Sequence, residues 1–215
     1  MAQRLGLLAL TGWLLLAPDA TGHALAQRIM GPLRIVILVD SSSAVAPMIN
    51  QFRAGLNAFL DDLPEGPEIA LISTGGQLRV RVPPTTDRER LRKEIARFAS
   101  DGGANALVDS LIEADNRFLK PTTEHKPTFV LLMTDLRTAG YELRADQYNR
   151  YVEDFMRRRG RAHGVVIHGV NMGLTTDIVM NLTGNTAGYY EVMAVPNALP
   201  LRMKQMAEMV AADIQ

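Results

Sequence analysis

Residues Leu33–Ala44 read LRIVILVDSSSA, an apolar run of strand length that stops at Asp40 and is followed by three serines. An apolar run without alternation is typical of a strand that is buried on both faces of a parallel sheet. In open α/β sheets, ligands bind beyond the carboxyl ends of the strands. The stretch therefore predicts a central parallel strand, with Asp40 and the serines at the edge of the sheet where binding sites form.

The rest of the chain alternates between helix and strand patterns. Helices are predicted for 45–63, 87–98, 106–119, 145–159, 175–183 and 198–212, and strands for 68–73, 77–82, 127–134, 162–170 and 188–193. Strands separated by helices form parallel sheets through right-handed crossovers, whereas the short link at 74–76 makes the next strand antiparallel. Pro83 and Pro84 are expected to end that strand. We expect one Rossmann-like α/β domain over 27–215, doubly wound, with a mostly parallel sheet and one antiparallel edge strand.

The first 26 residues are typical of a secretory signal peptide. Arg4 supplies the positive charge, Leu5–Ala17 forms a short apolar stretch, and Ala24–Ala26 is an A-x-A cleavage pattern. The mature chain would begin at Gln27, with no later stretch of transmembrane length. The chain has no cysteine, which suits a bacterial periplasm or exterior better than an animal extracellular space. We expect an exported protein, periplasmic or secreted, and leave open whether the signal is cleaved or retained as an anchor.

Charge and motifs argue against several classes of function. The chain has 23 basic and 23 acidic residues, so its charge favours neither nucleic acid nor an anionic membrane as partner. It contains no G-x-S-x-G elbow, phosphate-binding loop or dinucleotide-binding fingerprint, and no histidine has a second ligand at zinc spacing. One enzymatic alternative stays open, a hydrolase that would use Ser42 with His168 and Asp135 at the edge of the sheet.

Three loops carry a resemblance to a known family. Asp40-Ser41-Ser42 resembles the start of the Asp-x-Ser-x-Ser motif in the metal-ion-dependent adhesion site of von Willebrand factor type A domains, and the order of elements is similar to that family, above all to exported bacterial members. Ala44 stands where the motif has its second serine, and Ala104 stands where the second loop carries a threonine. Asp135 matches the aspartate that ends the next core strand. The resemblance implies Asp40, Ser42 and Asp135 as the ligands of an incomplete metal site.

The two alanines make strong metal binding unexpected. A hard divalent cation such as Mg²⁺ requires about six oxygen ligands in near-octahedral geometry. We expect weak or absent binding of Mg²⁺ or another divalent cation, with no certain cofactor. Asp101 and Asn105 could supply replacement ligands, or they could cap the helix that begins at 106; the capping interpretation is favoured.

The resemblance implies an adhesion or scaffold role rather than catalysis. We expect an exported, non-enzymatic module that binds a protein at the carboxyl edge of the sheet, through the loops at 40–46, 101–106 and 135–141. The candidate partner contacts are Ser41, Ser43, Asp101, Asn105 and Tyr141. The alternative is a metal-dependent adhesion module, and sensitivity of binding to a chelator would distinguish the two.

Overall fold

The computed structural model describes residues 34–119, 127–134, 150, 154, 164–173 and 177–212. The predicted signal peptide, the predicted loop at 135–141 and most of the predicted helix at 145–159 lie outside these residues. The described elements, in chain order, are β1 (Arg34–Val39), η1 (Ser43–Met48), α1 (Ile49–Asp62), β2 (Glu68–Ser73), β3 (Arg79–Thr85), α2 (Arg88–Arg97), α3 (Leu107–Ala114), η2 (Asp115–Leu119), β4 (Pro127–Thr134), β5 (Val166–Met172), α6 (Asp177–Asn185), β6 (Tyr190–Met193), η6 (Pro196–Ala198) and α7 (Leu199–Ala212).

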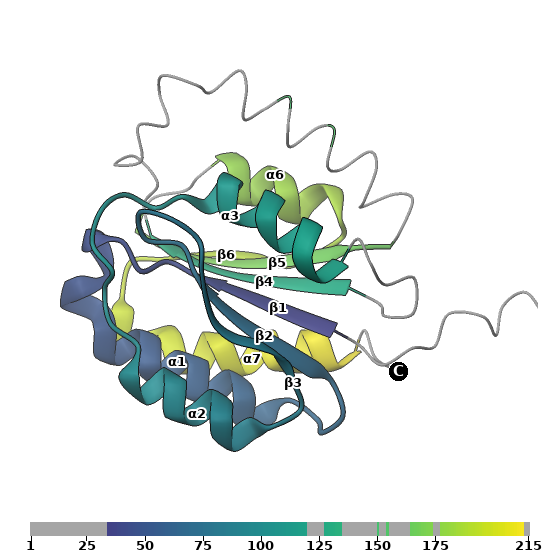
Figure 1. Ribbon diagram of the computed structural model, residues 1–215, viewed down its shortest axis with the longest axis horizontal. Coiled ribbons are helices and arrows are strands. Elements are labelled where there is room, and N and C mark those ends of the chain that lie inside the picture. The colour runs from purple at the N-terminus through teal and green to yellow at the C-terminus, as the bar shows by residue number, and fades with distance from the viewer. Residues whose placement is uncertain are drawn as a thin grey trace, which may run out of the picture.

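The strands form one sheet in the order β3-β2-β1-β4-β5-β6, with helices on both faces (Figure 1). All neighbouring pairs are parallel except β2 and β3, which are antiparallel. This confirms the predicted doubly wound α/β fold with one antiparallel edge strand. Because Val39 is in register with both Ser73 and Leu132, the carboxyl ends of β1, β2 and β4 meet at the same edge.

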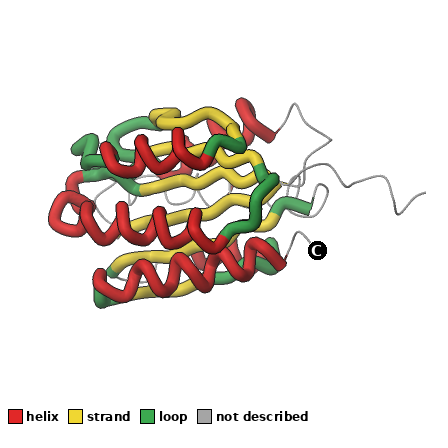
Figure 2. The backbone as a smooth tube through the Cα atoms, turned by 90° about the horizontal axis from the view of Figure 1, so that it is seen from below, coloured by secondary structure: helices red, strands yellow, loops and turns green. Residues whose placement is uncertain are grey.

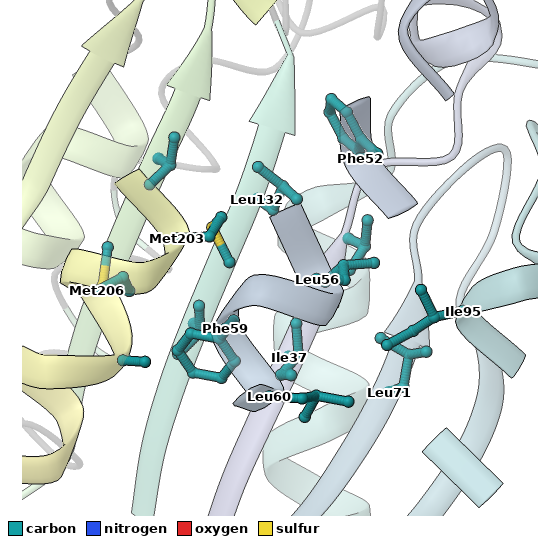
Figure 3. Close-up of a cluster of buried hydrophobic side chains, with 14 of the residues drawn as sticks. Ile37, Phe52, Leu56, Phe59, Leu60, Leu71, Ile95, Leu132, Met203 and Met206 are labelled. Atoms are coloured by element: carbon teal, nitrogen blue, oxygen red, sulfur yellow. The ribbon is translucent and has the colours of Figure 1, made fainter. Parts of the chain in front are cut away.

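Side chains alternate along β1 between two apolar cores. Ile35, Ile37 and Val39 belong to the core under α1, α2 and α7, whereas Val36 and Leu38 belong to the core under α3 and α6. Figure 2 shows the helices packed over the strands, and Figure 3 shows the first core at closer range. A strand that serves two cores must be apolar at every position, which is why the sequence of β1 shows no alternation.

The strands at Glu68–Ser73 and Pro127–Thr134 have the predicted bounds. The prediction that Pro83 and Pro84 end their strand is wrong, because β3 continues through both to Thr85. Proline lacks the N–H that a central strand needs, but β3 lies at the edge of the sheet and its pairing with β2 is irregular at this point.

Two predicted helices are divided. The segment 45–63 begins as the 3₁₀ helix η1, which contains Pro47, and becomes α-helical only from Ile49. The segment 106–119 ends as the π-helical turn η2. In the described ranges, no helix is both long and apolar enough to cross a membrane.

Candidate functional site at the carboxyl edge

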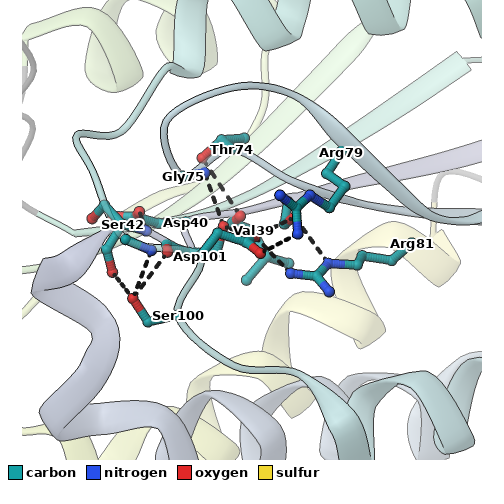
Figure 4. Close-up of polar contacts among 12 residues, drawn as sticks. Val39, Asp40, Ser42, Thr74, Gly75, Arg79, Arg81, Ser100 and Asp101 are labelled. Carbon is teal, nitrogen blue, oxygen red and sulfur yellow. Dashed lines mark hydrogen bonds and ion pairs between the residues drawn. The ribbon is translucent and has the colours of Figure 1, made fainter.

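Three segments far apart in the sequence meet at the carboxyl edge of the sheet, and we call residues 40–43, 73–76 and 100–105 the edge cluster (Figure 4). Backbone hydrogen bonds join them: Thr74 N–H donates to the carbonyl of Val39 at 3.0 Å, and Asp101 N–H donates to that of Ser41 at 2.7 Å. The cluster therefore connects the ends of β1 and β2 to the loop that precedes α3.

Asp40 is fully buried at the end of β1 and anchors it to β4. Its Oδ1 accepts a hydrogen bond from the backbone N–H of Ser42 at 2.7 Å, and its Oδ2 accepts one from the N–H of Thr134 at 3.1 Å. The hydroxyl of Thr134 also donates to Oδ2. Both carboxylate oxygens are thus occupied by bonds that hold the loop to the sheet.

Ser41 and Ser42 are both buried, but their hydroxyls have different surroundings. The Oγ of Ser41 donates to Oδ2 of Asp101 and accepts from the N–H of Gly75, each at 2.8 Å. Among the described residues, the Oγ of Ser42 has no hydrogen-bond partner. Ser43, the first residue of η1, is exposed. Of the three serines, Ser43 is therefore the one whose side chain is open to a partner.

Asp101 is the most heavily hydrogen-bonded side chain of the edge cluster. Its Oδ2 accepts from the hydroxyls of Ser41 at 2.8 Å and Ser73 at 3.0 Å and from Nη2 of Arg81 at 2.6 Å, while its Oδ1 accepts from Nη1 of Arg79 at 2.9 Å. Burial by itself would raise the pKa of this carboxyl group, but the hydrogen bonds from Ser41, Arg81 and Ser73 together with the charge of Arg81 hold the pKa below its ordinary value. Asp101 is accordingly a carboxylate near neutral pH.

Asn105 connects the same loop to the end of β2. Its side-chain carbonyl accepts a hydrogen bond from the hydroxyl of Thr74 at 2.7 Å, and its amide donates to Sδ of Met133 at 3.2 Å. The first residues of α3 receive no side-chain cap, and its N-cap position is Ala106. The expectation that Asp101 and Asn105 cap this helix is therefore wrong, because both side chains bind the neighbouring loops instead.

Glycines allow the loops of the edge cluster to approach this closely. A Cβ atom at Gly75 would lie 2.4 Å from the carbonyl oxygen of Ser41. Gly76, Gly102 and Gly103 have φ angles of 68°, 80° and 68°, which side chains other than glycine rarely adopt. The two glycine pairs therefore leave a rim at this edge that carries few side chains.

Of the three predicted metal ligands, Asp40 and Ser42 lie among the described residues and Asp135 does not. Asp40 uses both carboxylate oxygens in hydrogen bonds, Ser42 offers one unpaired hydroxyl, and Ala44 and Ala104 have no oxygen to offer. Nowhere in the described ranges do three or more His, Cys, Asp or Glu side chains gather as they would around a metal ion. Asp135 and Tyr141 lie outside the described residues, so their candidate roles stay predictions.

His168 does not pair with Ser42. It lies in β5 in register with Val130, four residues before the end of β4 at Thr134, which corresponds to about 13 Å along the strand. Its Nδ1 accepts a hydrogen bond from the N–H of Tyr189 at 3.2 Å, and the hydroxyl of Ser42 has no partner. The nucleophile and base that the hydrolase alternative requires are not brought together.

Arg79 and Arg81 were not among the residues that the sequence singled out. They alternate with Leu78, Val80 and Val82 in the predicted edge strand, which indicates one polar face but not what that face contacts. The structure places both guanidinium groups on Asp101, and Arg81 also lies over the ring of Phe98, 5.8 Å from its centroid. Strand alternation was the available signal, and only the fold brings this face to the loop at 100–105.

Comparison with known proteins supports the same fold. Solved structures that match include a von Willebrand factor type A protein from Catenulispora acidiphila (TM-score 0.68, 17% identity, 86% of this chain and 43% of that one). A second is proximal thread matrix protein 1 from the mussel byssus with a zinc-occupied MIDAS motif (TM-score 0.61, 14% identity, 86% of this chain and 47% of that one). A third is the conserved hypothetical protein BatB from Bacteroides thetaiotaomicron (TM-score 0.61, 12% identity, 84% of this chain and 99% of that one). The chain thus spans less than half the length of the first two.

A search by sequence among curated proteins finds no match. Residues 35–139 match the family model for the von Willebrand factor type A domain, VWA_2, and this range holds β1 to β4 together with the edge cluster. The strand order, the parallel sheet and the helices on both faces agree with that match. Residues 35–139 therefore match the von Willebrand factor type A domain family, and the chain has the fold of that family.

Proposed function

We propose that this chain is an exported, non-enzymatic protein-binding module, and that it binds its partner through the edge cluster with weak or no dependence on divalent metal. Von Willebrand factor type A domains are protein-interaction modules, which supports the general role. The observation that carries the proposal is that hydrogen bonds hold the three loops together. Ser41, Asp101 and Asn105 are all hydrogen-bonded to neighbouring loops. Ser43 and Gly103 are exposed beside them. A surface held in one conformation loses little entropy on binding.

Site-specific photocrosslinking tests this proposal. A photoreactive residue at Ser43 in intact source cells should form an adduct with a protein, whereas the same residue at exposed Glu65, in the loop before the amino end of β2, should not. The Ser43 adduct should persist in a chelator. Equal adducts at both positions, or none at Ser43, would contradict the proposed surface.

A metal-dependent adhesion module is the second candidate. It is favoured by one observation, the buried hydroxyl of Ser42 that has no hydrogen-bond partner, because a cation could be the missing partner. The mussel protein with a zinc-occupied motif shares the fold at 14% identity. Loss of the Ser43 adduct in chelator and its return with Mg²⁺ or Zn²⁺ would favour this candidate over metal-independent binding.

Export is tested separately. If the first 26 residues act as a signal peptide, mass spectrometry of the protein from the cell envelope or medium should find Gln27 at its amino terminus. Recovery of the protein in the cytoplasm with Met1 intact would contradict export.

A further inference from the structure

Arg79 combines exposure with a fixed position at the rim of the edge cluster. Its side chain is 54% exposed, while the Asp101 side chain to which it is bound is 7% exposed. Among the described residues, the side chain of Arg79 makes one hydrogen bond, from Nη1 to Oδ1 of Asp101 at 2.9 Å. A long side chain that would otherwise sample many rotamers is thereby held in place by a buried group.

The hydrogen bond of Arg79 to Asp101 uses Nη1 and not the edge of the guanidinium group that Nε and Nη2 form. Among the described residues, Nε and Nη2 of Arg79 contact no acceptor. These two nitrogens point the same way and can donate two parallel hydrogen bonds to one carboxylate. The free edge of Arg79 is therefore shaped for an acidic group that comes from outside the domain.

Arg79 shares its carboxylate with a second arginine. Asp101 is bound more closely by Arg81, at 2.6 Å, and the side chain of Arg81 is 15% exposed. Glu94 lies 3.8 Å from Arg81, on the side of α2. Arg81 thus has two carboxylates beside it, whereas Arg79 has, among the described residues, only the one that it shares.

The rim around Arg79 is open. An added Cβ at Gly102 would meet no atom within 4 Å, and one at Gly76 would meet only the carbonyl oxygen of Gly102, at 3.9 Å. Both residues have positive φ angles, so a substitution would be strained even though the space is free. A partner's backbone can therefore come close to Arg79 here.

We propose that Arg79 is the anchor by which the edge cluster binds a carboxylate of an acidic segment in its protein partner. The inference rests on the proposed protein-binding function and adds the chemistry of the partner. Asp101 acts as the positioning residue, because it orients Arg79 and does not itself face the partner. Binding of this kind needs no metal ion.

The test uses a soluble peptide of alternating glutamate and glycine, with glutamine in place of glutamate as the uncharged control, titrated in chelator at low salt. Amide resonances of Gly76, Gln77 and Gly102 should shift with the acidic peptide only. Arg79→Gln should weaken binding at least about tenfold, since hydrogen bonds to charged groups are among the stronger ones. Arg79→Lys should restore it only in part, because lysine lacks the two-pronged edge.

Arg117→Gln is the matched control. Arg117 lies in η2, away from the edge cluster, and its side chain is 53% exposed and pairs with Glu113 of α3. Equal weakening by Arg79→Gln and Arg117→Gln, or no shift at the rim, would overturn the inference. So would a Ser43 crosslink in cells that is undiminished in Arg79→Gln, and in that case the edge would still bind protein and the proposed function would stand. Absence of any Ser43 crosslink would instead remove the proposed function, whatever the peptide does.

Discussion

At the scale of single residues, the chemistry of the edge cluster depends on which way each side chain turns. Ser41 and Ser42 are neighbours of the same type and are both buried, yet one hydroxyl makes two hydrogen bonds and the other makes none. A buried polar group without a partner is unfavourable, whereas a satisfied one contributes to stability. Replacing each serine by alanine therefore compares the loss of a hydrogen-bonded hydroxyl with the loss of an unpaired one.

Ser41→Ala should lower the free energy of unfolding by about 2 kcal/mol, because it leaves the N–H of Gly75 without its acceptor and removes a donor to Asp101. Ser42→Ala should change it by less than about 0.5 kcal/mol or raise it slightly, because only an unpaired hydroxyl is removed. Urea unfolding in chelator measures both. A larger loss for Ser42→Ala than for Ser41→Ala would contradict this assignment.

Asp101→Asn should lower the free energy of unfolding by about 2–3 kcal/mol at neutral pH, because it removes the closer of the two carboxylates that face the nearly buried Arg81 and leaves only Glu94, at 3.8 Å. The pKa of Asp101 is lowered on folding, so the contribution of its charge is complete above the ordinary carboxyl pKa of 3.8 and is lost as the pH falls through the lower folded-state pKa. The difference between wild type and Asp101→Asn should therefore stay constant above about pH 5 and shrink below about pH 4.

Asp61→Asn provides the control for this prediction. Asp61 is 56% exposed and also pairs with an arginine, Arg92, at 2.6 Å. An exposed pair contributes at most about 1 kcal/mol, so this substitution should have little effect at any pH. A difference between wild type and Asp101→Asn that does not diminish in acid would show that the charge of Asp101 is not the source of its stabilisation.

At the scale of elements, α1 and α7 pack closely against each other in the first core. Gly55 lies in α1, and a Cβ there would sit 2.9 Å from Cγ of Leu199 and 3.1 Å from Cγ of Met203. Met203 and Met206 are fully buried in the same core (Figure 3). Glycine in a helix interior is intrinsically unfavourable by about 1 kcal/mol relative to alanine, so its presence here reflects the close packing of the two helices.

Gly55→Leu should destabilise the domain by about 1–3 kcal/mol through overpacking against α7. Gly184→Leu is the matched control, since Gly184 is also helical, in α6, but an added Cβ there meets nothing within 4 Å. It should be neutral or stabilising. Combining Gly55→Leu with Leu199→Ala should cost less than the sum of the single changes, and additive losses in thermal unfolding would contradict direct contact.

At the scale of the whole molecule, the carboxyl ends of β1, β2 and β4 meet at the edge cluster, where many of the side-chain oxygens of the described residues already take part in hydrogen bonds within the protein. A cation present at a hundred times its dissociation constant would stabilise the domain by about 2.7 kcal/mol. For a domain of this size that corresponds to a rise in melting temperature of about 5–10 °C. The number of preorganised ligands at the edge therefore has a measurable consequence for the stability of the whole domain.

Thermal unfolding curves of the Gln27–Gln215 chain in chelator and in millimolar Mg²⁺, Mn²⁺ or Ca²⁺ should coincide within about 1 °C, a shift far below the one expected of a saturated site. A rise of about 5 °C or more that Asp40→Ala abolishes would contradict weak or absent metal binding. It would instead favour the metal-dependent alternative.

The sequence by itself determined the class of fold and the edge of the sheet at which the polar residues after the central strands lie. Apolar runs at Arg34–Val39 and Pro127–Thr134 can be buried only as central strands, and the polar residues that follow them must then lie at one edge. These are local properties of period and composition. The failed boundaries, at Pro83 and at Pro47, occur where an edge position or a 3₁₀ turn tolerates a residue that a central element would reject.

Only the tertiary structure decided what the polar residues contact. That Asp101 binds Arg79 and Arg81 rather than capping α3, and that Ser42 stays unpaired beside a fully bonded Ser41, follows from how three loops and an edge strand come together in space. Hydrogen-bond partners separated by 20 to 94 positions leave no periodic trace in a sequence. Side-chain direction at the ends of strands depends on loop geometry, and loop geometry depends on the fold already being formed.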